Sequence, residues 1–232
     1  MVKYIIVAKN MPQMAKDNLI KLGFNLIDSA ELKTVHKGLK YHPDMQIVKG
    51  DNCYICAPEC YDYYKPYFEM LKIKLFKGEK SPGKKYPSDV LYNVAVVGDY
   101  AVHNFNYTDK QFINNSNFKQ INVKQGYSKC SICVVSETAV ITSDEGIANT
   151  LVKYDIDVLL VSAGSIDLSP FEYGFIGGAS GLVEKNKLAF CGNISLHPEY
   201  EAIYNFCKKY NVEIINLSLE KPCDIGTIIC IG

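Results

Sequence analysis

Residues 126–135 read Gly-Tyr-Ser-Lys-Cys-Ser-Ile-Cys-Val-Val, a glycine turn, a lysine and a cysteine followed by an apolar run. The apolar run predicts a strand, and Cys130 lies where that strand begins. Most cysteines are small core residues, so this position alone indicates little about function. It becomes informative because the whole chain repeats around it.

Each repeat unit reads as a strand, a hairpin, a second strand, a helix and a closing strand. In the fourth unit the strands are predicted at 131–135, 139–142 and 158–161, with a helix from 143 to about 154. The loops that enter the five units are Tyr41-His42-Pro43-Asp44, Ser88-Asp89-Val90, Ser128-Lys129-Cys130, Ile176-Gly177-Gly178 and Pro222-Cys223-Asp224. They are spaced by roughly 40 to 50 residues, a period typical of propellers.

The two ends of the chain complement each other. The first unit lacks its opening strand, and the apolar segment Thr227–Ile231 has no helix after it. If Thr227–Ile231 pairs with Lys3–Ala8, the ring closes and the open sheet edges disappear. We therefore expect an α/β fold: a five-bladed, pseudo-symmetric α/β propeller of ββαβ units, formed by residues 1–232 as a single domain.

Local signals refine this plan. The segment Pro58–Met70 predicts a helix interrupted or bent near Pro66. Thr108 is predicted to cap a short helix over 109–114. Two long loops, at about 29–40 and 77–88, are either lids or insertions.

The charge pattern disfavours several classes of partner. Acidic and basic residues number 25 each, and no basic run indicates a nucleic-acid or membrane surface. No apolar run approaches the ~20 residues that span a bilayer, and the first residues lack the pattern of a signal peptide. We expect a cytoplasmic protein.

The nine cysteines are scattered and odd in number, which predicts free thiols in a reducing compartment. Cys53, Cys56 and Cys60 form the one cluster. A metal site there would need a second ligand pair at suitable spacing, and none follows. We predict no metal.

Three loop motifs lie two units apart around the predicted ring: residues 175–180 (Phe-Ile-Gly-Gly-Ala-Ser), His42-Pro43-Asp44, and residues 126–130 (Gly-Tyr-Ser-Lys-Cys). In these motifs the chain resembles the pentein superfamily, the α/β propellers of guanidino-group-modifying enzymes. Arginine and agmatine deiminases, dimethylarginine dimethylaminohydrolase and amidinotransferases carry Gly-Gly-Asp, His-x-Asp and Gly-x-x-x-Cys motifs. The cyclic order agrees and the linear order differs, as in a circularly permuted branch. The aspartate after Gly-Gly is replaced here by Ala179, which weakens the expectation of guanidinium binding.

The resemblance implies a cysteine-dependent hydrolase or transferase that acts on a carbon–nitrogen bond of an amidine or guanidine through a thiouronium-type intermediate. Cys130 would be the nucleophile, His42 the general acid/base, and Asp44 would orient His42 or bind a cation. Lys129 beside Cys130 would favour the thiolate. Further substrate-binding candidates are Asp89, Gly177, Gly178, Ser180 and Asp224. The expected partner is a small molecule, and no cofactor is implied.

Plainer interpretations stay open. Cys130 can be a buried thiol, His42 a turn residue before a proline, and Gly177-Gly178 a tight turn. Asp44 and Asp89 can be solvated turn carboxylates. Cys223 lies at the same repeat phase and is a rival nucleophile. The alternatives to an enzyme are a non-catalytic pentein-fold binding protein, since a fold does not fix a function, and a thiol-reactive sensor.

Overall fold

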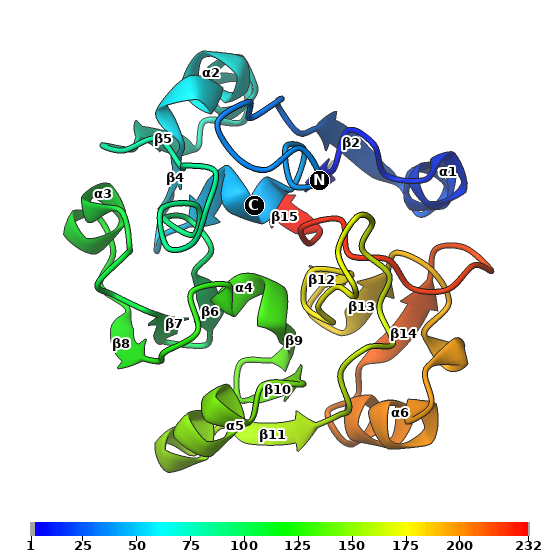
Figure 1. Cartoon of the computed structure of the whole chain (residues 1–232). Helices are drawn as coiled ribbons and strands as arrows, with labels where there is room; N and C mark the ends of the chain where they lie inside the picture. The colour runs from blue at the N-terminus through cyan, green and yellow to red at the C-terminus, as the bar shows by residue number, and fades with distance from the viewer. Residues whose placement is uncertain (1–2, 232) are drawn as a thin grey trace.

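Four of the five units in the described residues fold as an antiparallel hairpin followed by a helical connection that returns the chain to a parallel third strand. The computed structural model describes residues 3–231. Four sheets follow chain order: β3 (Ile47–Lys49), β4 (Cys53–Cys56) and β5 (Lys74–Lys77); β6 (Ala95–Val97), β7 (Tyr100–His103) and β8 (Lys119–Asn122); β9 (Ile132–Ser136), β10 (Ala139–Thr142) and β11 (Asp157–Leu160); β12 (Ser180–Glu184), β13 (Lys187–Phe190) and β14 (Glu213–Asn216). Figure 1 shows the sheets arranged around a common centre.

The fifth sheet is assembled from both ends of the chain. Strand β1 (Lys3–Val7) pairs in parallel with β2 (Phe24–Asp28) and antiparallel with β15 (Ile229–Ile231). The registers Tyr4↔Ile231 and Ile6↔Ile229 confirm the predicted pairing of the C-terminal strand with the first unit.

The five sheets stay separate, each with three strands, and within the described range no strand pairing joins one sheet to the next. Sheet edges therefore remain, and the expectation that pairing of the ends would remove them is wrong. The first strands of adjacent sheets lie next to one another without forming a ladder, as β15 does with β12 and β12 with β9. Between β12 and the residue before β15, the Ile228 amide donates to the Ser180 carbonyl over 3.1 Å. A cavity of about 200 Å³ lies among these first strands, and each inner strand contributes to its lining: Val48, Val96, Val134, Leu182 and Ile229.

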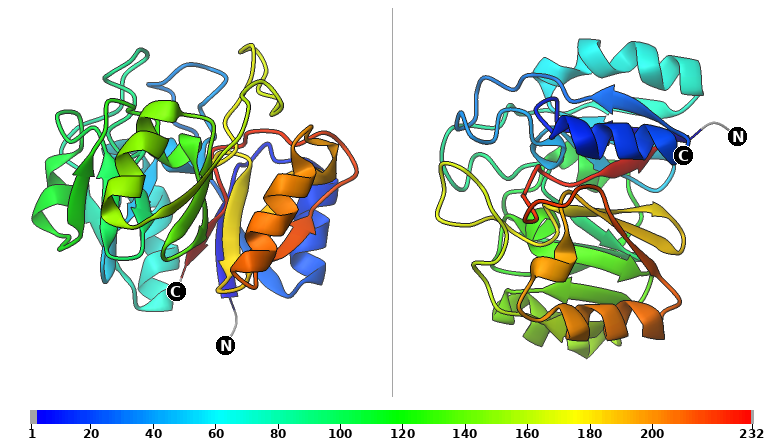
Figure 2. Two further views of the ribbon diagram at one scale, coloured as in Figure 1. Left: turned by 90° about the horizontal axis from the view of Figure 1, so that it is seen from below. Right: turned by 90° about the vertical axis from the view of Figure 1, so that its right-hand side faces the viewer.

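Helices lie outside the sheets and bury one face each (Figure 2). They are α1 (Gln13–Lys21), α2 (Tyr61–Leu71), α3 (Lys110–Asn114), α5 (Glu145–Leu151) and α6 (Tyr200–Lys209). In the fourth sheet, Leu188 and Phe190 pack with Ile203 and Cys207 of α6. The segments 29–42 and 162–175 rise together from the side of the molecule opposite the chain ends (Figure 2). No helix among residues 3–231 is long and apolar enough to cross a membrane.

Two local predictions need correction. Helix α2 is not interrupted at Pro66, which lies inside it between the buried rings of Tyr64 and Phe68, and a 3-10 turn (Pro58–Cys60) precedes it; a bend at Pro66 stays a prediction. Helix α3 is capped by Asp109, whose carboxylate accepts from the Gln111 amide over 2.9 Å. Thr108 cannot take that role because its hydroxyl binds the ring of His103 over 2.6 Å.

Candidate active site

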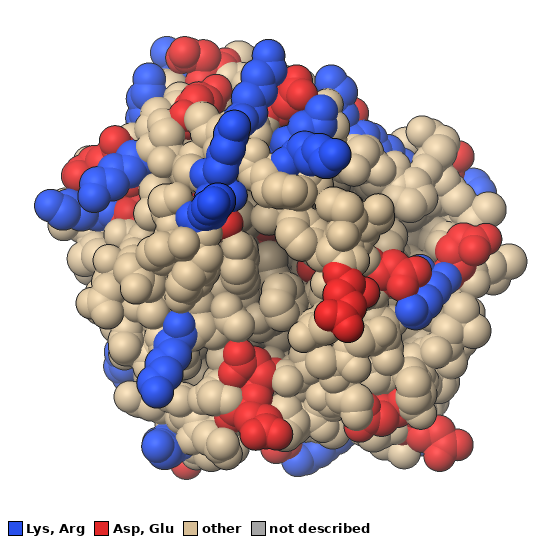
Figure 3. All heavy atoms as spheres, viewed as in Figure 1, with Lys and Arg blue, Asp and Glu red and all other residues tan. Residues whose placement is uncertain are grey.

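A cavity of about 300 Å³ is lined by the loops and turns that precede the inner strands of the sheets. Its polar lining residues are His42, Cys130, Glu172 and Asp224. The rest of the lining is apolar or aromatic: Leu39, Met45, Leu168, Phe171, Tyr127, Tyr173 and Phe175. In Figure 3 the central hollow is surrounded mainly by uncharged side chains, with acidic side chains beside it. The cavity therefore combines a small polar end with a mostly apolar wall.

Cys130 lies on a one-turn helix, α4 (Ser128–Ser131), directly before β9. From the sequence, Cys130 is expected at the start of the strand. In the structure the one-turn helix α4 lies at this point, and the Cys130 side chain lines the cavity. The thiol is 4 % exposed, and its Sγ donates a hydrogen bond to Oδ2 of Asp44 over 2.9 Å. Asp44 had been expected to orient His42 or bind a cation, and its observed contact is with the thiol.

Asn93 holds this turn in place. Its Oδ1 accepts from the backbone amides of Lys129 and Cys130, at 2.8 and 3.1 Å, and its Nδ2 lies 3.1 Å from the Cys130 Sγ. The side chain is fully buried. Asn93 thus fixes both the backbone and the thiol, a role that the sequence did not reveal.

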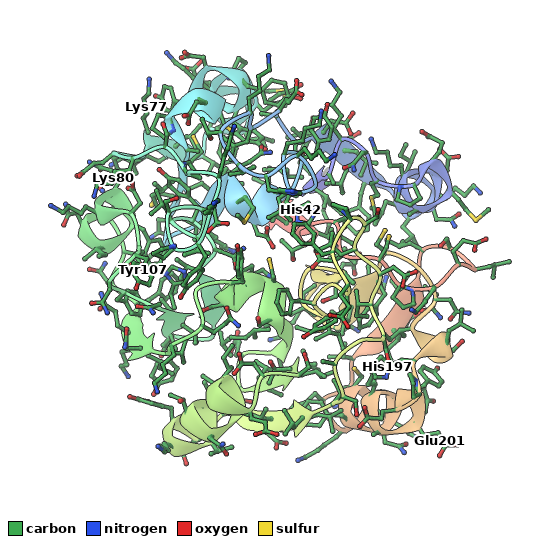
Figure 4. All side chains as sticks on the ribbon, in the orientation of Figure 1. His42, Lys77, Lys80, Tyr107, His197 and Glu201 are labelled. Carbon is green, nitrogen blue, oxygen red and sulfur yellow. The ribbon has the colours of Figure 1, made fainter. Side chains whose placement is uncertain are left out.

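His42 reaches the same cavity from the loop before β3, and Figure 4 shows it directed toward the centre. Its Nδ1 lies 3.8 Å from Oδ1 of Asp224. Asp224 is fixed by the backbone amides of Phe175 and Gly226, each at 2.9 Å. The carboxylate that approaches His42 is therefore Asp224, which the sequence had assigned to substrate binding.

Gly226 is needed where it stands. Its φ is +72°, and a Cβ there would collide with Cα and Cβ of His42. The close approach lets the Gly226 carbonyl accept from the Asp44 amide over 3.1 Å. One glycine thus sets the spacing between the His42 loop and the Asp224 loop.

Burial and like charges control ionisation at this end of the cavity. The pKa of Asp44 is raised to about 6; burial is the largest cause, His42 opposes it, and the Asp224 carboxylate adds to it. Burial, then Asp44 and Asp224, raise the pKa of the Cys130 thiol well above its ordinary value. Without a ligand the thiol is protonated and donates to Asp44.

The remaining predicted residues lie outside the lining described for this cavity. Asp89 accepts from the Tyr127 hydroxyl over 2.6 Å and so supports a wall residue. Lys129 lines the second cavity among the inner strands, where burial lowers its pKa. Neither side chain faces the thiol from within the first cavity.

The Gly177-Gly178 turn packs against α4 through backbone contacts. The Gly178 amide donates to the Cys130 carbonyl over 2.8 Å, and a Cβ on Gly177 would collide with the carbonyls of Cys130 and Ile132. Ser180 Oγ donates to the Gly177 carbonyl over 3.3 Å. These residues position the thiol turn through the backbone.

Cys223, the rival nucleophile, faces another thiol. Its Sγ lies 3.4 Å from Cys191 Sγ, and it is not among the residues that line the described cavity. The structure brings Cys130, and not Cys223, together with His42.

Sequence reasoning missed the segment that supplies Leu168, Phe171, Glu172, Tyr173 and Phe175 to the wall. Aromatic residues within a polar connection containing serine, glycine and proline were the signal that could have identified it.

Solved structures similar to this one share the architecture at very low sequence identity. An inosamine-phosphate amidinotransferase from Streptomyces griseus has a TM-score of 0.60 at 9 % identity, covering 98 % of this chain and 93 % of that one. DDAH from Pseudomonas aeruginosa, a cysteine-to-serine mutant in complex with citrulline, has a TM-score of 0.53 at 11 % identity, covering 94 % and 93 %. An agmatine deiminase from C. jejuni has a TM-score of 0.54 at 10 % identity, covering 94 % and 88 %.

These neighbours are members of the pentein superfamily, so the fold resemblance inferred from the loop motifs is confirmed. Within that class of fold, the chain belongs to a family of unknown function, DUF6873, whose model matches residues 6–229. No curated protein matches the chain in sequence.

Proposed function

We propose that the protein is a cysteine-dependent hydrolase or transferase that acts on a carbon–nitrogen bond of a cationic amidine or guanidine. The observation that carries this proposal is the meeting of the Cys130–Asp44 pair and the His42–Asp224 pair at one cavity. A nucleophile, an acid/base group and anionic groups are the parts that this chemistry needs. The likeness to pentein structures, one of them bound to citrulline, supports a small-molecule substrate.

The carboxylates favour a cationic substrate. An amidinium that reaches Asp44 and Asp224 replaces repulsion between like charges with attraction. The same positive charge lowers the pKa of the Cys130 thiol, since a nearby cation stabilises the thiolate. The nucleophile is therefore activated when the substrate is bound and stays protonated when it is not.

The reaction then proceeds in two halves. The Cys130 proton moves to Asp44, the sulfur bonds to the substrate carbon, and the C=N electron pair moves onto nitrogen. Protonated His42 gives its proton to the leaving amine, the C–N bond breaks, and a thiouronium-type intermediate remains on sulfur.

In the second half, water attacks the intermediate carbon while His42 takes the water proton. As the C–S bond breaks, the thiolate recovers the proton from Asp44, and the product hydroxyl releases its proton to solvent. In a transferase a second amine takes the place of water. All protein groups return to their starting protonation states.

Asp224 compensates for the carboxylate that is missing after Gly-Gly. Ala179 is fully buried, and its amide donates to the Phe175 carbonyl over 3.1 Å. We assign the cation-binding role to Asp224 and Asp44, and a supporting role to Asp89, Gly177, Gly178 and Ser180. Lys129 acts on the ionisation of Asp44 at a distance. In this proposal residues 1–232 form one domain, a five-bladed propeller closed around the site.

A screen of guanidines and amidines for release of ammonia or amine tests the proposal. We expect turnover by the wild-type protein and none by Cys130→Ser. Cys223→Ser is the matched control, because that thiol is more accessible but faces Cys191. Turnover that survives Cys130→Ser, or that is lost equally in Cys223→Ser, would contradict the assignment.

The second candidate is a non-catalytic protein that binds the same class of cation. Ala179 favours it, because a clamp carboxylate of the resembled motif is missing at that position. Tight binding of guanidines without any release of amine from the wild-type protein would select this alternative.

A further inference from the structure

The polar end of the cavity indicates which head group the substrate has, and the apolar wall indicates what kind of tail it has. Its aromatic side chains come mainly from the segment 162–175, and two are partly exposed to solvent: Phe171 is 40 % exposed and Tyr173 is 39 % exposed. Exposed aromatic surface that borders a cavity is available for an apolar ligand group.

The wall is backed by contacts with its neighbours. The Phe171 ring packs against His36, with centroids 4.9 Å apart, and so joins the segment 162–175 to the segment 29–42. On another side, Phe175 stacks with Tyr127 at 6.3 Å, and Asp89 holds the Tyr127 hydroxyl. The aromatic surface is thus supported from two directions.

Carboxylates outnumber basic groups at the cavity. Glu172 and Asp224 line it, and Asp44 lies directly behind the thiol. Among the described residues no lysine lines it, and the whole chain contains no arginine, since all 25 basic residues are lysines. His42 is the one basic group in the described lining, and Asp224 already approaches it.

A carboxylate on the substrate would have no partner there. It would lie between the exposed Glu172 and the buried Asp224, where it meets like charge and no counter-ion. A carboxylate-free apolar tail would instead cover Phe171 and Tyr173.

We propose that the site takes amidines or guanidines with an apolar, carboxylate-free tail, and that it discriminates against α-amino acids such as arginine. This inference rests on the proposed function for the cationic head group, and it specifies the rest of the substrate. Two observations together support this inference. The aromatic wall is partly exposed, and the one basic group in the described lining, His42, already lies near Asp224.

Binding can be measured apart from chemistry by titration calorimetry on Cys130→Ser. Three probes form a matched series: arginine, agmatine, which lacks the carboxylate, and n-pentylguanidine, in which a methyl group replaces the agmatine amine. We expect n-pentylguanidine to bind at least about tenfold more tightly than arginine, with the difference lost partly in Glu172→Gln because the arginine carboxylate is then repelled less.

The aromatic wall is tested with Phe171→Ala/Tyr173→Ala in the same background. We expect n-pentylguanidine to bind several-fold more weakly to this variant, while Tyr204→Ala, an exposed tyrosine on α6, leaves its affinity unchanged. Arginine binding as tightly as n-pentylguanidine, or no loss in the double variant, would overturn the inference.

The two proposals fail in different ways. Selective binding of apolar guanidines without turnover by the wild-type protein leaves this inference standing and removes the catalytic one. Turnover of arginine in preference to the apolar guanidines does the reverse. If none of the probes binds, the inference falls together with the proposed substrate class.

Discussion

The Cys130 thiol donates a hydrogen bond to the Asp44 carboxylate over 2.9 Å, although the two residues lie 86 positions apart in the chain. Both side chains are almost fully buried, and Asp44 raises the pKa of the Cys130 thiol, whereas the hydrogen bond from Cys130 lowers the pKa of Asp44 against the larger effect of burial. Without a ligand the pair therefore keeps one proton, on Cys130. It carries one buried negative charge, which a cationic ligand would stabilise.

The first prediction concerns stability against pH. The pKa of Asp44 is about 6 in the folded protein and 3.8 in the reference state, chiefly because of burial. Between these values the folded state binds the proton more tightly than the unfolded chain, so this group lowers stability as pH rises from about 4 to 6. Asp44→Asn cannot ionise, and at pH 7.5 we expect it to gain up to about 3 kcal/mol relative to wild type while losing activity.

Urea unfolding at pH 4 and pH 7.5 measures this difference, which should nearly vanish at the lower pH. Asp99→Asn is the control, because Asp99 is exposed in a hairpin turn away from the cavity. If Asp44→Asn is less stable than wild type at pH 7.5, the assignment of unfavourable charge to Asp44 is wrong.

The second prediction concerns Asn93. Asn93→Ala leaves the buried amides of Lys129 and Cys130 without the side-chain acceptor, and we expect a loss of roughly 2–4 kcal/mol in the free energy of unfolding. Asn93→Asp keeps an acceptor for the two amides but places a buried negative charge beside the sulfur, so at neutral pH it should cost at least as much stability as alanine and raise the pKa of the thiol further. Urea unfolding, together with the pH dependence of Cys130 alkylation, separates the two effects. Equal alkylation profiles in Asn93→Asp and wild type would show that Asn93 acts on the backbone alone.

The repeat made the architecture predictable, because apolar strands and helix signals recur in the same order in each unit. The pairing of Thr227–Ile231 with the first strand followed from the missing strand of the first unit, and the structure shows β15 on β1. Apart from the removal of the sheet edges, the predictions that failed were local. Thr108 and Asp109 are both good caps, and the choice depends on His103, which engages the Thr108 hydroxyl.

The site was predictable to the level of which loops meet, and not to the level of which side chains touch. Unit order placed His42 and Cys130 at one centre, and both line the cavity. Asn93 carries no motif, and its contacts reach α4 across 37 positions, so no local pattern identifies it. In the structure Asp44 contacts the Cys130 thiol and Asp224 lies near His42, whereas the sequence suggested Asp44 as the partner of His42. This arrangement depends on Gly226, which lies between the His42 loop and the Asp224 loop.

The third prediction concerns thiol reactivity. The raised pKa of Cys130 should make it slow toward neutral iodoacetamide, since the thiolate is the reactive form. Cationic 2-chloroacetamidine brings its own positive charge to the carboxylates, and we expect it to label Cys130 preferentially. Cys230, which is half-buried and whose charge environment includes Lys49 and Lys3, is the internal control and should prefer iodoacetamide. Peptide mass spectrometry gives both rates, and an equal preference at the two cysteines would contradict the anionic environment assigned to Cys130.

The fourth prediction isolates the role of Gly226 from its backbone conformation. Gly226 and Gly23 both have positive φ, +72° and +90°, so alanine at either position costs about 1 kcal/mol of backbone strain. At Gly23 a Cβ meets nothing within 4 Å, whereas at Gly226 it collides with His42. We expect Gly23→Ala to lose that strain energy and keep full activity, and Gly226→Ala to lose more stability and most of its turnover, because His42 must move away from Asp224. Unfolding midpoints and turnover of the two variants measured side by side decide the matter: equal activity in both would mean that the spacing of the His42 and Asp224 loops does not govern the reaction.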